Sequence, residues 1–131
     1  MAAGKWKLYE AAKKSLADGL MDFDSHTFRI GLFLSTSNAN DLTLTNAFLA
    51  DFTNQHAAAN GYTQVAEAAG KLVTITTARA GGTVTVDETT NPVWTAAGGS
   101  IIARFAVIFN DTHASNQALC VCLMDTTPAD V

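Results

Sequence analysis

The sequence is short of charge, and this shortage already excludes several classes of protein. Charged residues make up 15% of the 131 residues, whereas an average globular protein carries about 25%. Hydrophobic residues make up 48%, so the chain can bury a core and is not a disordered, solvating sequence. Its length fits one domain rather than two. Neutral polar groups must therefore cover much of the surface, and 17 threonines, which suit a pleated sheet, supply many of them.

The chain also lacks an excess of basic residues and any long apolar run. Its net charge is −4, so we predict no direct contact with DNA or RNA. No stretch approaches the roughly 18 apolar residues of a membrane span, and no apolar segment follows the first lysines, so neither a membrane contact nor a secretory signal is predicted. The charge is uneven: residues 1–14 hold four lysines and one glutamate (+3), whereas residues 15–131 hold four basic and eleven acidic residues (−7). This lysine cluster is either a solvated helix face or a basic arm that docks on an acidic neighbour.

Residue patterns that carry chemistry are missing as well. Cys120 and Cys122 stand too close for an unstrained disulfide, so we interpret them as reduced thiols of a cytosolic product. They lack the second cysteine pair of a zinc site, and His26, His56 and His113 are far apart in the sequence. Neither a nucleophile elbow nor a phosphate-binding loop occurs. We therefore predict that the chain is not an enzyme and that it has no cofactor and no metal.

Apolar periodicity predicts one helix followed by β-structure. Apolar residues at three- and four-residue steps predict a helix over residues 6–18, ended by Gly19. The period then changes to two, which predicts a strand from residue 28 to 34. Strands over residues 72–78 and 83–87 flank a two-glycine turn and predict a hairpin.

Three further strands are predicted over residues 93–95, 101–109 and 118–124. The last two have almost no polar face and are separated by a turn, so we expect them to pair antiparallel and to be covered on both sides. A second sheet covers one side; a helix, a long loop or another subunit covers the other. These two strands lead us to predict a homo-oligomer, with a dimer favoured and a trimer second.

Together these elements predict a mainly β fold, a β-sandwich or jelly-roll-like single domain over residues 1–131. It has one N-terminal α-helix, in a helical arm over residues 1–19, a long arm-like loop over 35–61 and a β-rich half over 62–131. So long a loop is usually functional or contact-making. The predicted core consists of Phe28, Ile30, Leu32, Val73, Ile75, Val84, Val86, Phe105, Val107 and Leu119.

Several segments resemble, in order, a known family of proteins. Residues 28–41 read FRIGLFLSTSNAND, residues 94–101 read WTAAGGSI, and residues 103–112 read ARFAVIFNDT. With NGYT at residues 60–63 and the opening at residues 9–19, they are similar to small virion proteins of tailed bacteriophages. The resemblance covers most of the chain and implies a non-enzymatic structural protein of the particle.

Within that family, the resemblance favours a capsid decoration, or cement, protein that clamps neighbouring major capsid subunits on the outer shell. A tail or head–tail connector component is the first alternative. A carbohydrate-binding β-sandwich module, with Trp6, Trp94 and Tyr62 as its aromatic candidates, is the second. The protein is then expected in the virion, and in the host cytoplasm before assembly. Interface residues are predicted among the N-terminal segment and the long loop: Lys5, Trp6, Lys7, Lys13, Lys14, Phe48 and Phe52.

Overall fold

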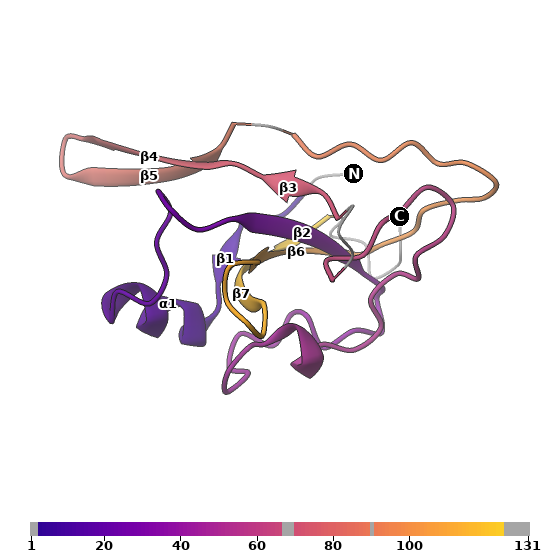
Figure 1. The fold of residues 1–131 in the computed structure, drawn as a ribbon, viewed down its shortest axis with the longest axis horizontal. Helices are drawn as coiled ribbons and strands as arrows, with labels where there is room; N and C mark the ends of the chain where they lie inside the picture. The colour runs from indigo at the N-terminus through magenta and orange to yellow at the C-terminus, as the bar shows by residue number, and fades with distance from the viewer. Residues whose placement is uncertain (1–2, 67–69, 90, 125–131) are drawn as a thin grey trace.

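A computed structural model describes residues 3–66, 70–89 and 91–124 (Figure 1). It contains a five-stranded antiparallel sheet in the order β1-β7-β6-β2-β3 and a separate two-stranded sheet, β4-β5. The mainly β class with an N-terminal helix is therefore confirmed. The elements are β1 (Lys7–Leu8), α1 (Glu10–Ala17), β2 (Phe28–Phe33), the 3₁₀ helix η1 (Leu49–Asp51), β3 (Leu72–Val73), β4 (Ile75–Ala80), β5 (Thr83–Glu88), β6 (Phe105–Asn110) and β7 (Gln117–Leu123).

The N-terminal helix begins later than its apolar periodicity predicts. Lys7 and Leu8 form β1 and pair with Val121 and Cys120 of β7, so their backbone groups stabilise the edge of the sheet and are not available to a helix. The helix starts at Glu10 and ends before Gly19, whose φ of 71° is the left-handed conformation that ends many helices. The predicted helix stop is confirmed, and the predicted start at residue 6 is wrong.

Three long strands, β2, β6 and β7, form the centre of the main sheet. β6 pairs along its whole length with β2, from Phe28 opposite Asn110 to Phe33 opposite Phe105. On its other side it pairs antiparallel with β7, as predicted, with an irregularity between Ile108 and Phe109. Every residue of β6 is buried. The sequence predicts this strand over residues 101–109, but in the structure it begins at residue 105 and ends at residue 110.

One face of this sheet is covered by the long loop between β2 and β3. Phe52 packs edge-on against Phe109 with ring centroids 5.2 Å apart, and it also contacts Phe33 and Tyr9. The loop then runs back along the free edge of β2, where the His56 N–H donates to the carbonyl of Leu32 at 2.9 Å. Figure 1 shows this loop as a layer beneath the sheet. We expected a helix, a long loop or another subunit on one face of the central strands, and the structure places the long loop there.

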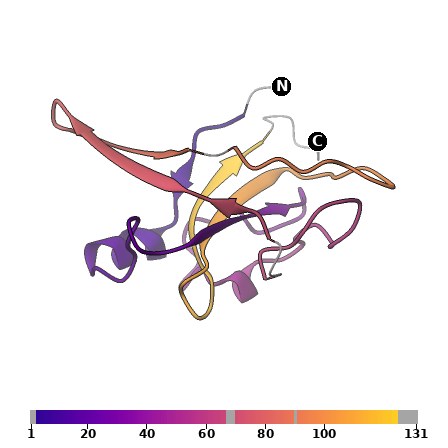
Figure 2. The ribbon, with the colours of Figure 1, turned by 45° about the horizontal axis from the view of Figure 1, so that its top comes forward.

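The opposite face is covered by the base of the hairpin and by the extended segment over residues 91–103 (Figures 1 and 2). Ile75, Trp94 and Ile101 from these segments pack against the core. The predicted strand over residues 93–95 does not form, because this segment crosses the turn at Asn60 and Gly61 instead of lying beside another strand. A Cβ on Gly61 would lie only 2.3 Å from the carbonyl oxygen of Thr95.

The predicted hairpin forms, but it leaves the body of the molecule. The chain changes sheets at Thr74, so the predicted strand over 72–78 is divided between β3 and β4. Val84 and Val86 are 64% and 49% exposed, and Ile75 is half-buried. The prediction that both valines belong to the core is wrong, since no described segment lies across from the outer part of the hairpin. The other predicted core residues are buried: Phe28, Ile30, Leu32, Val73, Phe105, Val107 and Leu119.

Candidate interaction surface

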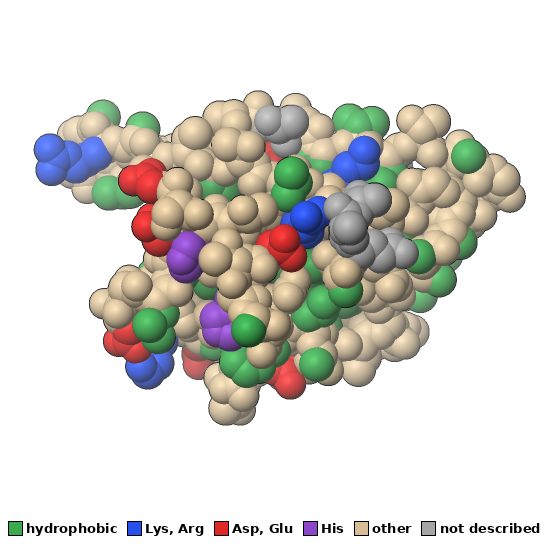
Figure 3. Space-filling view, viewed as in Figure 1, with side chains coloured by type: hydrophobic (Ala, Val, Ile, Leu, Met, Phe, Trp, Pro, Cys, Tyr) green, Lys and Arg blue, Asp and Glu red, His purple; other side chains and the backbone are tan. Residues whose placement is uncertain are grey.

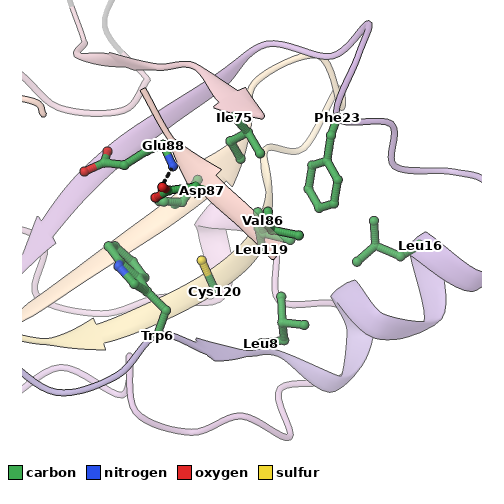
Figure 4. A pocket seen from close by; sticks show the side chains of 11 residues that line it. Trp6, Leu8, Leu16, Phe23, Ile75, Val86, Asp87, Glu88, Leu119 and Cys120 are labelled. Atoms are coloured by element: carbon green, nitrogen blue, oxygen red, sulfur yellow. Dashed lines mark hydrogen bonds between the residues drawn. The ribbon is translucent and has the colours of Figure 1, made fainter. Parts of the chain in front are cut away.

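A hollow with mostly apolar walls lies between the hairpin and the N-terminal segment (Figure 4). We call it the apolar groove. Its volume is about 220 Å³, which is smaller than the roughly 300–1,000 Å³ of pockets that enclose small ligands. It therefore resembles a docking groove more than a ligand pocket. Its lining residues are Trp6, Leu8, Leu16, Phe23, Ile75, Val86, Asp87, Glu88, Ile108, Leu119 and Cys120.

The position of β1 creates one wall of the groove. Because Leu8 pairs with Cys120 at the edge of the main sheet, Trp6 and Leu8 are held beside the strands that form the floor. The hairpin supplies the facing wall, where Val86 and Ile75 lie across from them in Figure 4. Trp6 is 44% exposed and Leu8 is 38% exposed, so the apolar walls are only partly covered by this chain.

Two adjacent carboxylates lie at the hairpin end of the groove. Asp87 accepts a hydrogen bond from the backbone N–H of Glu88 at 2.9 Å. Burial raises the pKa of Glu88, and the neighbouring Asp87 charge adds to this shift. One oxygen of Glu88, Oε2, is buried without a hydrogen-bond partner among the described residues. This end of the groove therefore favours an incoming positive charge.

The cysteine at the floor of the groove is not an activated nucleophile. Burial raises the pKa of Cys120 to about 12, with a smaller contribution from Cys122, so the side chain is a neutral thiol at neutral pH. The Cys122 thiol donates to the carbonyl of Gly4 at 3.1 Å. Both cysteines are free and buried, as expected for unpaired thiols packed in a core.

The four predicted interface lysines are all exposed near this surface. Lys5 and Lys7 flank Trp6 in the sequence, and Lys13 and Lys14 lie on α1. Within the described residues, Lys14 is the only one of the four with an ion pair, to Asp18 one helical turn later. The N-terminal segment is bound to its own sheet from Gly4 onwards, because the N–H of Gly4 donates to the carbonyl of Leu123 at 2.6 Å and β1 then pairs with β7.

The predicted aromatic residues of the long loop lie elsewhere and contact their own chain. Phe52 is part of the aromatic cluster beneath the sheet. Phe48 stacks on His113 with centroids 5.2 Å apart and forms an isolated β-bridge with Gln117. Among the predicted interface aromatics, the structure therefore places only Trp6 in the groove. Sequence reasoning missed Leu8 and assigned Val86 to the core.

The aromatic residues considered for sugar binding do not form an exposed platform. Tyr62 is buried, and its hydroxyl accepts a hydrogen bond from the N–H of Leu32 at 2.9 Å. Trp94 is half-buried and packs on the Tyr62 ring with centroids 5.4 Å apart. Trp6 is thus the most exposed of the three.

The part of the chain that the structure describes contains neither a cluster of metal ligands nor a membrane-spanning helix. There, no three His, Cys, Asp or Glu side chains come together as metal ligands. Within the same residues, no helix has the length and hydropathy needed to cross a bilayer. Comparison with protein-family models, curated proteins and solved structures finds no match to this chain.

Proposed function

We propose that this chain is a non-enzymatic structural subunit of a tailed-bacteriophage particle, and that it decorates the capsid by clamping neighbouring major capsid subunits. The observation that carries the proposal is the partly exposed apolar groove, with Trp6 and Leu8 on one wall and Val86 on the other. Exposed aromatic residues in a partly formed groove are typical anchors of protein–protein contacts. The resemblance of the sequence to phage virion proteins supplies the identity of the partner.

The charges around the groove suit this role. Lys5 and Lys7 flank Trp6 and are exposed, so they add a basic rim beside an aromatic anchor. Each such lysine contributes about 0–1 kcal/mol to binding, and less at high salt, so Trp6 carries most of the affinity. The protein would fold in the host cytoplasm, where its buried thiols stay reduced, and then attach to the outer surface of the capsid.

The homo-oligomer remains part of this proposal, although the apolar faces of β6 and β7, which led us to predict it, have another explanation. β6 and β7 lack a polar face because the long loop and the hairpin-side segments of the same chain cover them. A second copy is therefore not needed to bury these strands. The surface left for a second copy is the projecting hairpin, not the central sheet.

The proposal is tested by attachment of the purified chain to undecorated capsids of the phage that encodes it. Trp6→Ala should weaken attachment by about tenfold or more, which corresponds to the loss of an interface anchor. Leu20→Ala is the matched control, because Leu20 is 63% exposed but does not line the groove. Attachment of wild-type chain should also weaken as salt rises.

Equal attachment of Trp6→Ala and wild type, or equal loss in both variants, would contradict the proposed contact. Copy number distinguishes the location in the particle: a decoration protein occurs at about the copy number of the shell protein, and a connector as a small ring. Binding to a glycan array that Trp6→Ala abolishes would instead favour the carbohydrate-binding alternative.

A further inference from the structure

The hairpin β4–β5 is a two-stranded sheet that has no third strand within the described residues. Its strands pair with each other over six positions, from Ile75 opposite Glu88 to Ala80 opposite Thr83. All residues from Thr76 to Asp87 are exposed. An isolated hairpin of this kind is marginally stable in water. Figure 3 shows it projecting from the body with basic side-chain atoms at its end.

The geometry of the turn decides which backbone groups of β5 face outward. Gly81 and Gly82 have φ of 55° and 80°, as in the two-residue turns that close tight hairpins. Beside such a turn, Ala80 and Thr83 form a hydrogen-bonded pair, and bonded and non-bonded pairs then alternate. The N–H and C=O groups of Val84 and Val86 therefore point away from β4.

The first four residues of β5 lack the charged side chains and prolines by which proteins protect exposed edge strands. The stretch Thr83-Val84-Thr85-Val86 contains no proline, no lysine and no other charge. The edge ends at Glu88, whose N–H is already bonded to the Asp87 carboxylate. Two residues, Val84 and Val86, thus offer four open backbone groups.

We propose that this edge binds a second copy of the same chain. β5 of one copy pairs antiparallel with β5 of the other around a two-fold axis at Thr85, and the two hairpins form one four-stranded sheet. The proposal deepens the homo-oligomer of the proposed function by naming the contact, and it uses no property of the capsid.

The register follows from self-complementarity of the strand. With Thr85 on the axis, Val84 of each copy lies opposite Val86 of the other, and these are the residues whose backbone groups point outward. The two Val–Val pairs form four hydrogen bonds, and the two Thr85 side chains meet at the axis. Thr83 lies opposite Asp87, so no like charges face each other across the new contact.

The charge distribution along the hairpin favours the same antiparallel arrangement. Arg79 is the only basic residue between Ile75 and Glu88 and lies near the turn, whereas Asp87 and Glu88 lie at the base. An antiparallel pair brings the basic end of each hairpin toward the acidic base of the other. Glu88, whose Oε2 has no partner among the described residues, lies at this base.

The outer edge of β4 is a poorer match. The residues whose backbone groups face outward there are Ile75, Thr77 and Arg79, by the same alternation. Ile75 packs against the core, and Thr77 borders a shallow hollow beside Asp22 and Asp24. This edge is therefore occupied at its base and carries the charge of Arg79, whereas the stretch of β5 from Thr83 to Val86 is exposed and uncharged.

Disulfide trapping tests the register directly. Thr85→Cys places two thiols opposite each other at a non-hydrogen-bonded position, where Cα atoms are about 4.5 Å apart and a disulfide can form. Under oxidised glutathione we expect the full chain to give a covalent dimer on non-reducing gels. Thr83→Cys is the control on the same strand face, because its copies lie far apart in this register. Equal cross-linking of both variants, or of neither, would overturn the proposal.

Light scattering over a range of protein concentrations tests whether the outer edge of β5 forms the dimer contact. The contact is small, so we expect wild-type chain to change from monomer to dimer as its concentration rises. Val84→Pro removes an outward N–H without removing a hydrogen bond inside the hairpin, and it should weaken the dimer by about tenfold or more. Thr77→Pro does the same on the β4 edge without removing a charge, and it should leave the dimer intact.

Three other outcomes of the scattering experiment would contradict the proposal. A chain that stays monomeric at all concentrations would overturn the proposal but leave capsid attachment untouched. A dimer that Thr77→Pro abolishes and Val84→Pro does not would place the contact on the edge of β4 and overturn the proposal. A dimer that neither variant weakens, or that both weaken equally, would show that the contact does not depend on the edge of β5.

Discussion

The main sheet and the hairpin differ both in sequence and in surroundings: β6 has almost no polar face, whereas β5 alternates threonine with valine. Val107 in β6 is fully buried, whereas Val84 in β5 is 64% exposed. β6 is covered by the long loop on one face and by the hairpin base and the segment over residues 91–103 on the other. A strand that is apolar on both faces thus predicts a cover on each side. Alternation predicts that a strand forms and which residues share a face, but the rest of the chain decides whether that face is covered.

The largest contrast is expected from truncating a buried ring in the sheet. Phe109 is fully buried and packs on Phe33 and Phe52, so Phe109→Ala should lower the free energy of unfolding by about 3–5 kcal/mol. Val84→Ala in the hairpin should change it by less than about 0.5 kcal/mol. Urea denaturation followed by circular dichroism measures both, in dilute protein so that association does not contribute. A large loss for Val84→Ala would show that the hairpin belongs to the core.

Two glycines with positive φ, one in the body of the molecule and one in the hairpin, test the same difference through the backbone. Gly61 has φ 87° and is packed against the Thr95 carbonyl, whereas Gly82 has φ 80° and open space around it. Gly61→Ala should cost about 2–4 kcal/mol, because the backbone must shift as well as adopt a strained conformation. Gly82→Ala carries only the conformational strain, about 1–2 kcal/mol, and only within the hairpin. Thermal denaturation should show a lowered midpoint for Gly61→Ala alone; equal midpoints would contradict this packing.

The role of the long loop as a cover is tested at Phe52. This side chain is half-buried beneath the sheet, so Phe52→Ala should destabilise the fold by about 2–3 kcal/mol, less than for a fully buried ring. Phe48→Ala is the control from the same loop, because Phe48 stacks on His113 near the edge, and its effect should be about half as large. If Phe52→Ala unfolds no more easily than Phe48→Ala, the loop does not stabilise the sheet through this ring.

A small, pH-dependent effect on stability is expected at the base of the hairpin. Burial, with Asp87 nearby, raises the pKa of Glu88 in the folded state, so its ionisation costs stability as pH rises above the range in which the unfolded carboxyl titrates. Glu88→Gln should therefore stabilise the protein at pH 7 by less than about 1 kcal/mol. The gain should vanish near pH 4, where the wild-type carboxyl is protonated. A gain that does not change with pH would show that charge is not its cause.

Most of the β-structure could be predicted from the sequence, whereas the segments that pack on each face of the sheet could not. β2, β6, β7 and the hairpin follow from alternation and turn residues, but β1 is only two residues long and has no periodicity of its own. Phe48 and Phe52 are four residues apart, and nothing in that spacing tells whether the rings face their own sheet or a partner. Long-range packing decides such questions.

The candidate site, too, could be predicted only in part from the sequence. Trp6 could be selected because a tryptophan among lysines is unusual, but its partner across the groove, Val86, was assigned to the core. One signal was available: the hairpin register places Val84 opposite Arg79 and Val86 opposite Thr77. A strand face that contains an arginine and a threonine is a poor candidate for a buried core.

The pairing of β1 with β7 has a consequence for how the protein is made. Lys7 pairs with Val121, so β1 leaves the ribosome well before the strand that it pairs with. Tyr9, which is fully buried in the folded molecule, has no complete sheet to pack on until β7 has been synthesised. The main sheet therefore forms only after β7 has left the ribosome, and pairing between such distant residues makes its folding slow. During synthesis, the nascent N-terminal segment remains open to chaperones.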